Sequence, residues 1–522
     1  MQSQRSMTRR GFNKLTSLAA VSGMSWGTNW AAGADDKVSI RTAGTKDQNP
    51  IDVGTRKQLL IDNRFIAKSQ GVSLRMNPPR KMGAVLEADR PWEAGWVGAY
   101  HGVAEDDGIY KMWYNATSEN GRNGRLCYAT SSDGVHWEKP SLDLVELAGS
   151  RDNNLVLGKS AEGAVYLDPI APPEARFKLL VWRSVLGTSN HDGMLLVTSP
   201  DGLHWTKEYP VLPAVSDTQS EVFWDDRINK YVSYLRAYPP HDLQRAMVHC
   251  EIPKQDILKP WPYSSATEPV VISTIPRIST ENLPLVIARD EKDPRHSSVY
   301  TPGVHKYPWA ENAYFAFPSF FRHTVPDEAK PGDVPDSGVL QTQLLVSRNG
   351  ISWARPDRRP YVPLGLVGEP DSHGIYMGMG MLRRGNWLYM YYGGFASGHE
   401  DPVYDDSALM LVTQRLDGFL SVEALWDGGE FTTPPLNVEG RRLQVNIETS
   451  VLGSLHVEVQ DSAGSSIDGY TANDCDTIIT NDVARTVTWR GKEDLPVNIS
   501  DPVRLRFALR NAKLYAFQFA AS

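Results

Sequence analysis

Short alternations of apolar and polar residues run along most of the chain, and no stretch keeps apolar residues at helical spacing. Aromatic and β-branched residues dominate the apolar positions, and 42 Gly and 35 Pro separate the runs. A period of two is the pattern of half-buried strands, and Gly and Pro mark the turns between them. The sequence therefore predicts an all-β protein.

One strand-like motif recurs at intervals of about 50 to 85 residues, which suits a four-stranded propeller blade with variable loops. Its five copies are Tyr110–Tyr114, Phe177–Trp182, Tyr231–Leu235, Tyr314–Phe317 and Trp387–Tyr392. Each copy follows an apolar stretch at a hairpin's distance, and these expected inner strands are Val97–Ala104, Ala164–Asp168, Val222–Asp225, Val299–Val304 and Ile375–Leu382. The repeat predicts a five-bladed β-propeller over residues 58–427.

Three copies of the motif are followed by a segment that combines Ser, an Asp-Gly or Asn-Gly pair and Trp, namely Ser131–Trp137, Ser199–Trp205 and Ser347–Trp353. Gly supplies the positive φ of a tight turn, and the Asp or Asn before it bonds nearby backbone. We expect each Trp to pack between neighbouring blades. These hairpins are therefore predicted to be structural.

Beyond residue 428 the alternating runs change in spacing and become Leu443–Ile447, Leu455–Val459, Thr486–Trp489, Val503–Phe507 and Leu514–Phe519. This pattern predicts a C-terminal β-sandwich over residues 428–522. The strand-like segment Gln58–Ile66 is expected to close the propeller ring against the last blade, since closure removes an exposed edge. Residues 35–57 are then a linker.

The composition of the chain limits the kinds of ligand and site that we expect. The net charge is −8, and no cluster of Lys and Arg suggests contact with backbone phosphates, so nucleic acid is not expected and a neutral ligand fits better. Cys127, Cys250 and Cys475 are widely spaced and odd in number, which excludes a disulfide framework and a C-x-x-C site. Buried free thiols are expected.

The first residues resemble an export signal. Arg9 and Arg10 precede a mildly apolar stretch to about Trp30, and Ala32-Gly33-Ala34 gives a small-residue cleavage site. This order is typical of the twin-arginine route, so residues 1–34 are predicted to be a signal peptide. No later segment approaches the roughly 18 consecutive apolar residues of a membrane helix. A periplasmic or secreted protein without a membrane partner is expected.

Carboxylates recur just before the expected inner strands, where propellers commonly bind ligands over the central channel. They are Asp89, Glu93, Glu162, Asp217, Glu221, Asp293, Glu369 and Asp371. His and acid residues stand side by side after three of the motif copies, as His191-Asp192, His241-Asp242 and His399-Glu400. Paired carboxylates across a pocket suit glycoside cleavage, in which one donates a proton and the other activates water or attacks the sugar.

Aromatic residues near Glu93, namely Trp92, Trp96 and Tyr100, are candidates for stacking on sugar faces, although Trp in a propeller more often packs between blades. Adjacent His and acid residues lack metal-ligand spacing, so neither a catalytic metal nor a cofactor is expected.

Several of these segments together carry a resemblance to a known family: Leu60–Ile66, Asp89–Glu93, the three Ser-and-Trp hairpins, Asp217–Gln219 and Leu514–Phe519. The chain resembles exported relatives of the five-bladed propeller glycosidases, a superfamily that includes arabinanases, β-xylosidases, invertases and levansucrases. The resemblance covers nearly all of the mature chain and implies the propeller-plus-sandwich layout of the invertase branch. It also implies a carbohydrate substrate.

The family carries three catalytic acids on its first three blades, and this chain departs from that pattern. Ala99 or Tyr100 stands where the first acid is expected, and Glu93 is the nearest substitute. Glu162-Gly163 occupies the region of the second acid, and Asp217 and Glu221 bracket the third. The resemblance therefore implies the fold more firmly than the mechanism.

The resulting hypothesis is an exported glycoside hydrolase acting on a plant or algal polysaccharide or oligosaccharide. The expected catalytic residues are Glu93, Asp217 and Glu221, and the expected substrate-binding residues are Trp92, Trp96, Tyr100, His191, Asp192, His241, Asp371, His373 and His399. A non-catalytic glycan-binding propeller is the first alternative. A sialidase-like enzyme is the second, although only Arg295 stands at the start of an expected inner strand, where several arginines are needed to capture sialic acid.

Overall fold

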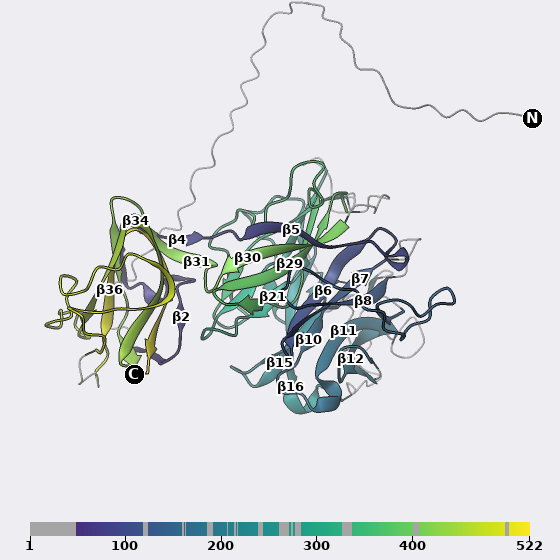
Figure 1. Cartoon of the computed structure of the whole chain (residues 1–522), viewed down its shortest axis with the longest axis horizontal. Coiled ribbons are helices and arrows are strands. Elements are labelled where there is room, and N and C mark those ends of the chain that lie inside the picture. The colour runs from purple at the N-terminus through teal and green to yellow at the C-terminus, as the bar shows by residue number, and fades with distance from the viewer. Residues whose placement is uncertain are drawn as a thin grey trace, which may run out of the picture. The chain divides into compact units, whose positions relative to one another are not determined.

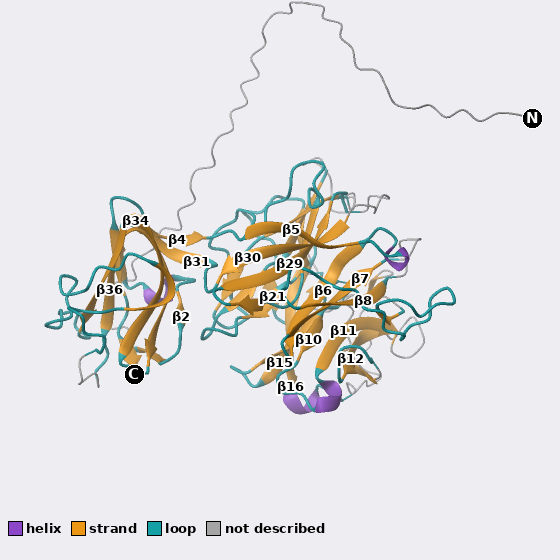
Figure 2. Cartoon of the chain, in the orientation of Figure 1, coloured by secondary structure: helices purple, strands orange, loops and turns teal. Residues whose placement is uncertain are grey.

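The structure is a computed structural model that describes residues 49–117, 124–158, 161, 163–184, 192–205, 207–212, 216, 218–238, 244–259, 271–272, 275–276, 283–325, 337–399, 407–495 and 501–521. The predicted signal peptide lies outside these ranges. Within them the chain is nearly all strand and loop (Figure 2). The helical turns are four short 3₁₀ segments: η1 (Asn63–Phe65), η2 (Pro91–Glu93), η3 (Pro173–Ala175) and η4 (Lys254–Asp256). In the described ranges no helix is long and apolar enough to cross a membrane.

Four sheets of four antiparallel strands are propeller blades (Figure 1). The first blade consists of β6 (Val97–Asp106), β7 (Ile109–Ala116), β8 (Arg125–Ser131) and β9 (Leu155–Leu157). The second consists of β10 (Val165–Leu167), β11 (Phe177–Ser184), β12 (Asp192–Ser199) and β13 (Lys207–Leu212). The third blade consists of β14 (Glu221–Asp225), β15 (Lys230–Ala237), β16 (Ala246–Pro253) and β19 (Leu285–Ile287). The fourth consists of β21 (Val304–Lys306), β22 (Tyr314–Ala316), β25 (Leu345–Ser347) and β26 (Trp353–Ala354). The first four copies of the sequence motif form the second strands of these blades, as predicted.

The fifth copy of the motif lies in an eight-stranded sheet. Its strands are β20 (Ser297–Thr301), β23 (Ser319–His323), β24 (Gly338–Thr342), β27 (Gly374–Met377), β28 (Leu382–Arg384), β29 (Trp387–Phe395), β30 (Ser407–Arg415) and β5 (Arg80–Glu87). The order β27-β29-β30-β5 repeats the order of a blade, and β5 reaches β30 from the opposite end of the sequence (Figure 1).

Most of the remaining strands come from the two ends of the described chain and pair with one another. One sheet holds β2 (Gln58–Leu59), β3 (Lys68–Gln70), β4 (Val72–Met76), β31 (Leu420–Ala424), β32 (Gly429–Thr432), β34 (Arg442–Gln460), β35 (Asn481–Thr486) and β36 (Arg504–Ala520). Two short pairs complete the set: β1 (Ile51–Gly54) with β33 (Leu436–Val438), and β17 (Val271–Ile272) with β18 (Ile275–Pro276).

The expected role of residues 58–66 in ring closure is wrong. In β2, Gln58 pairs with Phe517 and Leu59 with Ala516 of β36, whereas β5 supplies the strand beside β30. The reason is the apolar content of residues 59–66, which is buried against the C-terminal strands. Phe65, for example, packs edge to face on Phe517 with ring centroids 5.2 Å apart.

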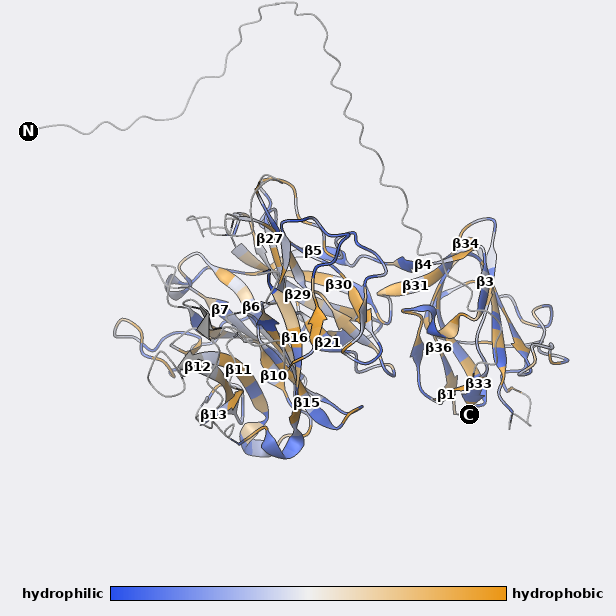
Figure 3. Cartoon of the chain, turned by 180° about the vertical axis from the view of Figure 1, so that it is seen from behind, coloured by the Kyte–Doolittle hydropathy of each residue, from blue (hydrophilic) through white to orange (hydrophobic). Residues whose placement is uncertain are grey.

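Separate apolar clusters lie between neighbouring blades. The cluster between the first and second blades contains Trp113, Tyr128 and Phe177, and its Trp113 ring lies 5.3 Å from Phe177. Similar clusters join the second blade to the third and the third to the fourth. A further cluster joins β5, β29 and β30 to the first blade. Successive side chains of a strand point to opposite faces, and many strands in Figure 3 carry both hydrophobic and hydrophilic residues.

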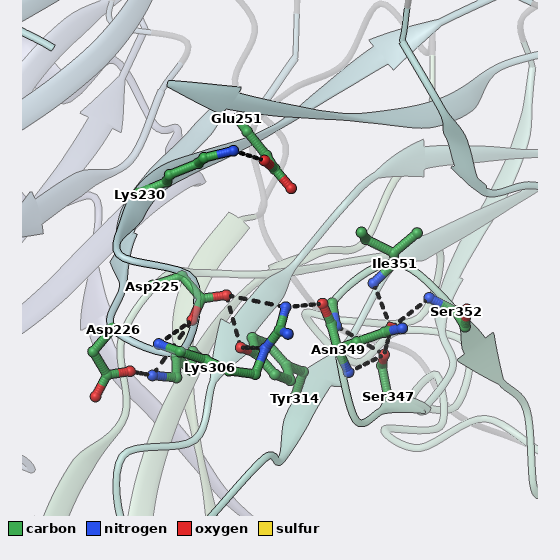
Figure 4. Close-up of polar contacts among 12 residues, drawn as sticks. Asp225, Asp226, Lys230, Glu251, Lys306, Tyr314, Ser347, Asn349, Ile351 and Ser352 are labelled. Carbon is green, nitrogen blue, oxygen red and sulfur yellow. Dashed lines mark hydrogen bonds and ion pairs between the residues drawn. The ribbon is translucent and has the colours of Figure 1, made fainter. Parts of the chain in front are cut away.

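The three Ser-and-Trp hairpins are structural, as predicted. In the third of them the Ser347 hydroxyl accepts the Gly350 amide at 2.9 Å, and Asn349 Oδ1 accepts the amides of Ile351 and Ser352 (Figure 4). The same bonds recur around Ser131 and Ser199. The glycine carbonyl of each hairpin also accepts a hydrogen bond from a side chain of another sheet: Gly202 from Trp113, Gly350 from Tyr234 and Gly134 from Tyr391.

Replacing Gly202 by Ala is expected to lower the free energy of unfolding by about 2 to 4 kcal/mol, since a non-glycine residue is strained at positive φ and a crowded core resists added volume. Gly202 has φ +82°, and an added Cβ meets Trp113 Cζ2 at 2.4 Å. Gly108 is the matched control, because it has φ +76° with no atom within 4 Å of a Cβ. Denaturant unfolding measures both, and equal losses for the two variants refute the packing role of Gly202.

Candidate functional site

The innermost strands of the blades begin at one common rim. Parallel bridges join Gly102 to Met379 and Gly163 to Ser220, so neighbouring inner strands run in the same direction. We call the end at which β6, β10, β14 and β27 begin the N-terminal rim, and the opposite end the C-terminal rim. The residues predicted from sequence to bind substrate were expected at the N-terminal rim.

Six aromatic residues from five strands or their flanks gather at the N-terminal rim and form what we call the rim cluster: Trp96, Tyr100, Tyr300, Phe321, Tyr376 and Phe395. The Tyr376 ring is central, with centroids 6.1 Å from Tyr100, 5.9 Å from Tyr300 and 5.2 Å from Phe395. Trp96 packs on Phe395 at 5.6 Å. Of the predicted substrate-binding residues, Trp96 and Tyr100 therefore meet here.

Thr218 connects three separate sheets at the rim cluster. Its hydroxyl lies 3.0 Å from the Tyr100 hydroxyl and donates to the backbone oxygen of Tyr300 at 3.1 Å. Buried Thr218 thus ties the start of β14 to β6 and β20. Asp217, the residue before it in sequence, lies outside the described residues.

Two arginines and a histidine border the rim cluster. The guanidinium carbons of Arg236 and Arg245 lie 4.8 and 5.1 Å from the Tyr300 ring centroid, within the range of a cation–π contact. The predicted residue His399 packs edge to face on Tyr300 at 4.9 Å. Neither arginine was predicted from the sequence, because neither stands beside a carboxylate or histidine in a candidate loop. One feature of the sequence could have indicated Arg236: it is a charged residue that directly follows the apolar run Tyr231–Leu235.

Glu221, a predicted catalytic residue, begins β14 and is fully buried. Its carboxyl group accepts the Val304 amide at 2.8 Å and the Gln219 side-chain amide at 3.3 Å. Burial raises its pKa well above the ordinary range, and these hydrogen bonds offset only part of the shift. The group is therefore held in its protonated form and secures the segment that leads to Thr218.

Glu221→Gln is expected to flatten the pH dependence of stability. The folded state keeps a proton that the unfolded chain releases above its ordinary pKa of 4.5, so wild-type stability is full at low pH and falls as pH rises toward the folded-state pKa. The loss is up to about 1.4 kcal/mol per pH unit in that window. Denaturation at several pH values above 4.5 measures it. Parallel profiles for the variant and wild type contradict a protonated Glu221.

Glu93 does not face the rim cluster. It ends η2, is fully buried and accepts the Asp89 amide at 2.9 Å, the Arg90 amide at 3.0 Å and the Tyr114 hydroxyl at 2.7 Å. The Lys139 ammonium lies 2.8 Å from the same carboxylate. These four donors occupy the acceptor sites that substrate chemistry needs, so the geometry favours a structural role for Glu93.

Three other predicted residues have side-chain partners outside the rim cluster, although the His373 backbone bonds Phe395 of the cluster. Trp92 donates its indole proton to Asn154 at 2.7 Å. Asp371 accepts the Lys81 ammonium at 2.6 Å and the Tyr392 hydroxyl at 2.7 Å, and His373 shares a proton with the Ser372 hydroxyl at 2.9 Å. The predictions at His191, His241 and the side chain of Asp192 fall outside the described residues.

Among the described residues, no three His, Cys, Asp or Glu side chains gather in a way that could hold a metal ion. Cys127, Cys250 and Cys475 are buried free thiols, as predicted. A cavity of about 580 Å³ opens near the N-terminal rim and is lined by Arg322, His323, Thr324, Val325 and Val339.

Comparison with known proteins gives only distant likenesses. No family model and no curated protein matches the chain. Among solved structures, a β-fructofuranosidase from Bombyx mori has 11% identity and a TM-score of 0.39, covering 86% of this chain and 96% of its own. A thermostable family-43 glycoside hydrolase has 15% identity and a TM-score of 0.38, covering 63% and 93%.

A third solved structure is an N-acetylgalactosamine deacetylase from F. plautii in complex with blood group B trisaccharide, with 12% identity and a TM-score of 0.41, covering 65% of this chain and 94% of its own. At these scores the likenesses assign neither a family nor a substrate. The blades are defined by the strand pairing of this chain, and its function has to be argued from its own residues.

Proposed function

We propose that this protein is an exported glycoside hydrolase that cleaves a plant or algal polysaccharide or oligosaccharide at the N-terminal rim. The observation that carries the proposal is the rim cluster of six aromatic residues, two of which, Tyr100 and Tyr300, are bonded to Thr218. Aromatic rings beside fixed polar groups suit the apolar faces and hydroxyls of sugars. Arg236 and Arg245 both lie within cation–π distance of the Tyr300 ring.

We assign the chemistry to Glu162 and Asp217. Both acids lie outside the described residues, and the nearest described contact is the parallel bridge between Gly163 and Ser220. In the proposed reaction Glu162 protonates the oxygen of the leaving sugar, and Asp217 activates water or attacks the anomeric carbon. Glu221 acts as a positioning residue, since its buried carboxyl group bonds the side chain of Gln219, two residues after Asp217.

The experiment is reducing-end release by the full chain from a panel of plant and algal polysaccharides and aryl glycosides. Release from at least one substrate, saturable and proportional to protein concentration, is the expected result. A panel without release, combined with retained glycan in a pull-down, selects a non-catalytic glycan-binding propeller instead.

That second function is favoured by one observation. Among the residues that the structure describes, Glu221 is buried and Asp371 is bonded to Lys81 and Tyr392. The carboxylate of Glu93 already accepts hydrogen bonds from its own neighbours, including the Tyr114 hydroxyl. None of the three offers a carboxylate to the rim cluster. The catalytic proposal therefore depends on Glu162 and Asp217, and their replacement tests it.

We also propose that β27, β29, β30 and β5 form a fifth blade and that the strands after residue 428 form a β-sandwich with β1 to β4. The bond from Tyr391 of β29 to the Gly134 hairpin of the first blade supports the closed ring. The pairing of β36 with β2 and β34 supports the second unit. Limited proteolysis that released the segment 51–76 without unfolding the C-terminal strands would refute this division.

Export through the twin-arginine route remains part of the proposal, with residues 1–34 as the signal peptide. Cell fractionation of the full chain tests it, and protein retained at full length in the cytoplasm refutes it.

A further inference from the structure

A cavity of about 1580 Å³ opens at the C-terminal rim, opposite the proposed catalytic site. Its walls are the ends of the inner strands β6, β10, β14 and β21, together with the segments 307–312 and 379–383 and the pair Arg56-Lys57. Sites for small ligands commonly measure about 300 to 1,000 Å³. This cavity therefore has room for more than one sugar unit, and the proposed function makes no use of it.

Three half-buried aromatic side chains line the cavity: Tyr166, Trp224 and Trp309. Their neighbours hold them in place. The Trp224 ring packs on Tyr231 with centroids 5.1 Å apart and carries the Lys254 ammonium at 5.6 Å, and Tyr166 accepts the Trp224 amide at 3.2 Å. Trp309 packs edge to face on Tyr307 at 5.1 Å. Rings fixed in this way offer stacking surfaces without a cost of ordering them.

The charges of the cavity are largely neutralised in pairs. Arg56 lies 2.7 Å from Glu311. Lys306 pairs with Asp226 and lies 3.6 Å from Asp225 (Figure 4). Two further lining cations have partners outside the cavity: Lys57 with Asp417, and Arg176 with Asp106. An anionic ligand has to compete with these carboxylates, whereas a neutral hydroxyl-rich ligand can donate to them.

We propose that the C-terminal-rim cavity is a second carbohydrate site, which binds a neutral oligosaccharide through Trp224, Trp309 and the carboxylates at its edge. Glu105 is the clearest of these carboxylates, because it lines the cavity and is exposed. This site does not depend on the proposed hydrolysis, since its residues lie at the opposite end of the inner strands. It allows the protein to hold a glycan chain at a place separate from cleavage.

The test is isothermal titration of the full chain with xylohexaose, cellohexaose, laminarihexaose and hexagalacturonate. At least one neutral hexamer is expected to bind, and Trp309→Ala is expected to weaken it at least about tenfold, the equivalent of 1.4 kcal/mol. Glu105→Gln keeps the shape of an exposed side chain and is expected to weaken binding without lowering the melting temperature. Binding that survives Trp309→Ala and Glu105→Gln overturns the proposal, and so does binding of hexagalacturonate alone.

A control separates this site from the proposed catalytic one. Trp96→Ala removes a ring of the N-terminal rim cluster and is expected to leave the C-terminal-rim affinity unchanged, whereas Trp309→Ala is expected to leave reducing-end release unchanged. If Trp96→Ala abolishes all binding, the protein has one glycan site at the N-terminal rim and the second site is refuted. Absence of binding by every neutral hexamer refutes it as well, whatever the catalytic assay shows.

Discussion

Asp217→Asn is expected to lower the turnover number by about 10²- to 10⁴-fold on any glycan that the wild type cleaves, which is the usual contribution of a positioned acid or base. Asn keeps the size and polarity of the side chain but cannot act as a base or form a glycosyl ester. The change therefore removes the chemistry while the bonds of Thr218 to Tyr100 and Tyr300 are kept. Initial rates of reducing-end release at saturating substrate measure the effect.

Glu93→Gln is the matched control for Asp217→Asn. Glu93 is held by Lys139, Tyr114 and two backbone amides, so its loss of charge is expected to lower stability. The protein that remains folded should keep its turnover number. If Glu93→Gln abolishes turnover while Asp217→Asn does not, Glu93 is the catalytic residue. That result refutes the assignment of the chemistry to Asp217.

Asp168→Ala is expected to lower the free energy of unfolding by about 3 to 5 kcal/mol, the cost of leaving a buried ion pair with one partner. Asp168 is bonded to the ammonium group of Lys178 at 2.6 Å, to the Tyr231 hydroxyl at 2.6 Å and to the Ile170 amide at 3.0 Å. The Lys178 side chain is fully buried, so solvent cannot replace the lost carboxylate. Tyr231 belongs to the third blade, and the loss therefore weakens a contact between blades.

Glu251→Ala is the control for Asp168→Ala, because Glu251 bonds Lys230 at the same 2.6 Å but with both side chains partly exposed (Figure 4). Such a surface pair contributes about 0 to 1 kcal/mol. Denaturant unfolding of both variants gives the comparison. Losses of equal size would contradict the claim that burial makes the Asp168 network important.

Local signals in the sequence predicted local structure well. The Ser-and-Trp hairpins form as expected because every bond in them joins residues within a few positions, as between Ser347 and Gly350. The first four aromatic runs form second strands of blades because their residues are buried on both faces, as at Trp113 and Tyr114. The partner of a strand is a different matter. Gln58–Ile66 has the composition of a closing strand, yet its apolar residues fit the C-terminal strands better.

The candidate site was only partly predictable for the same reason. Trp96 and Tyr100 lie in the rim cluster and His399 packs on its Tyr300, and their role in substrate binding stays a prediction. The partners of Glu93 could not be read from the sequence, because Lys139 lies 46 positions away and follows a different hairpin. Arg236 lies within β15 and Arg245 directly precedes β16, so neither stands in a loop with the pattern of a ligand site. No pattern along one chain indicates which carboxylate a distant ammonium group will reach.

The central claim is cleavage of a glycosidic bond by water at the N-terminal rim, and the most direct measurement is digestion of a glycan in water enriched in the heavy oxygen isotope. Mass spectrometry of the products is expected to find one heavy oxygen at each new reducing end with wild-type protein and none with Asp217→Asn. Products without the isotope, or glycans that lose acetyl groups while their chains stay intact, would contradict the account.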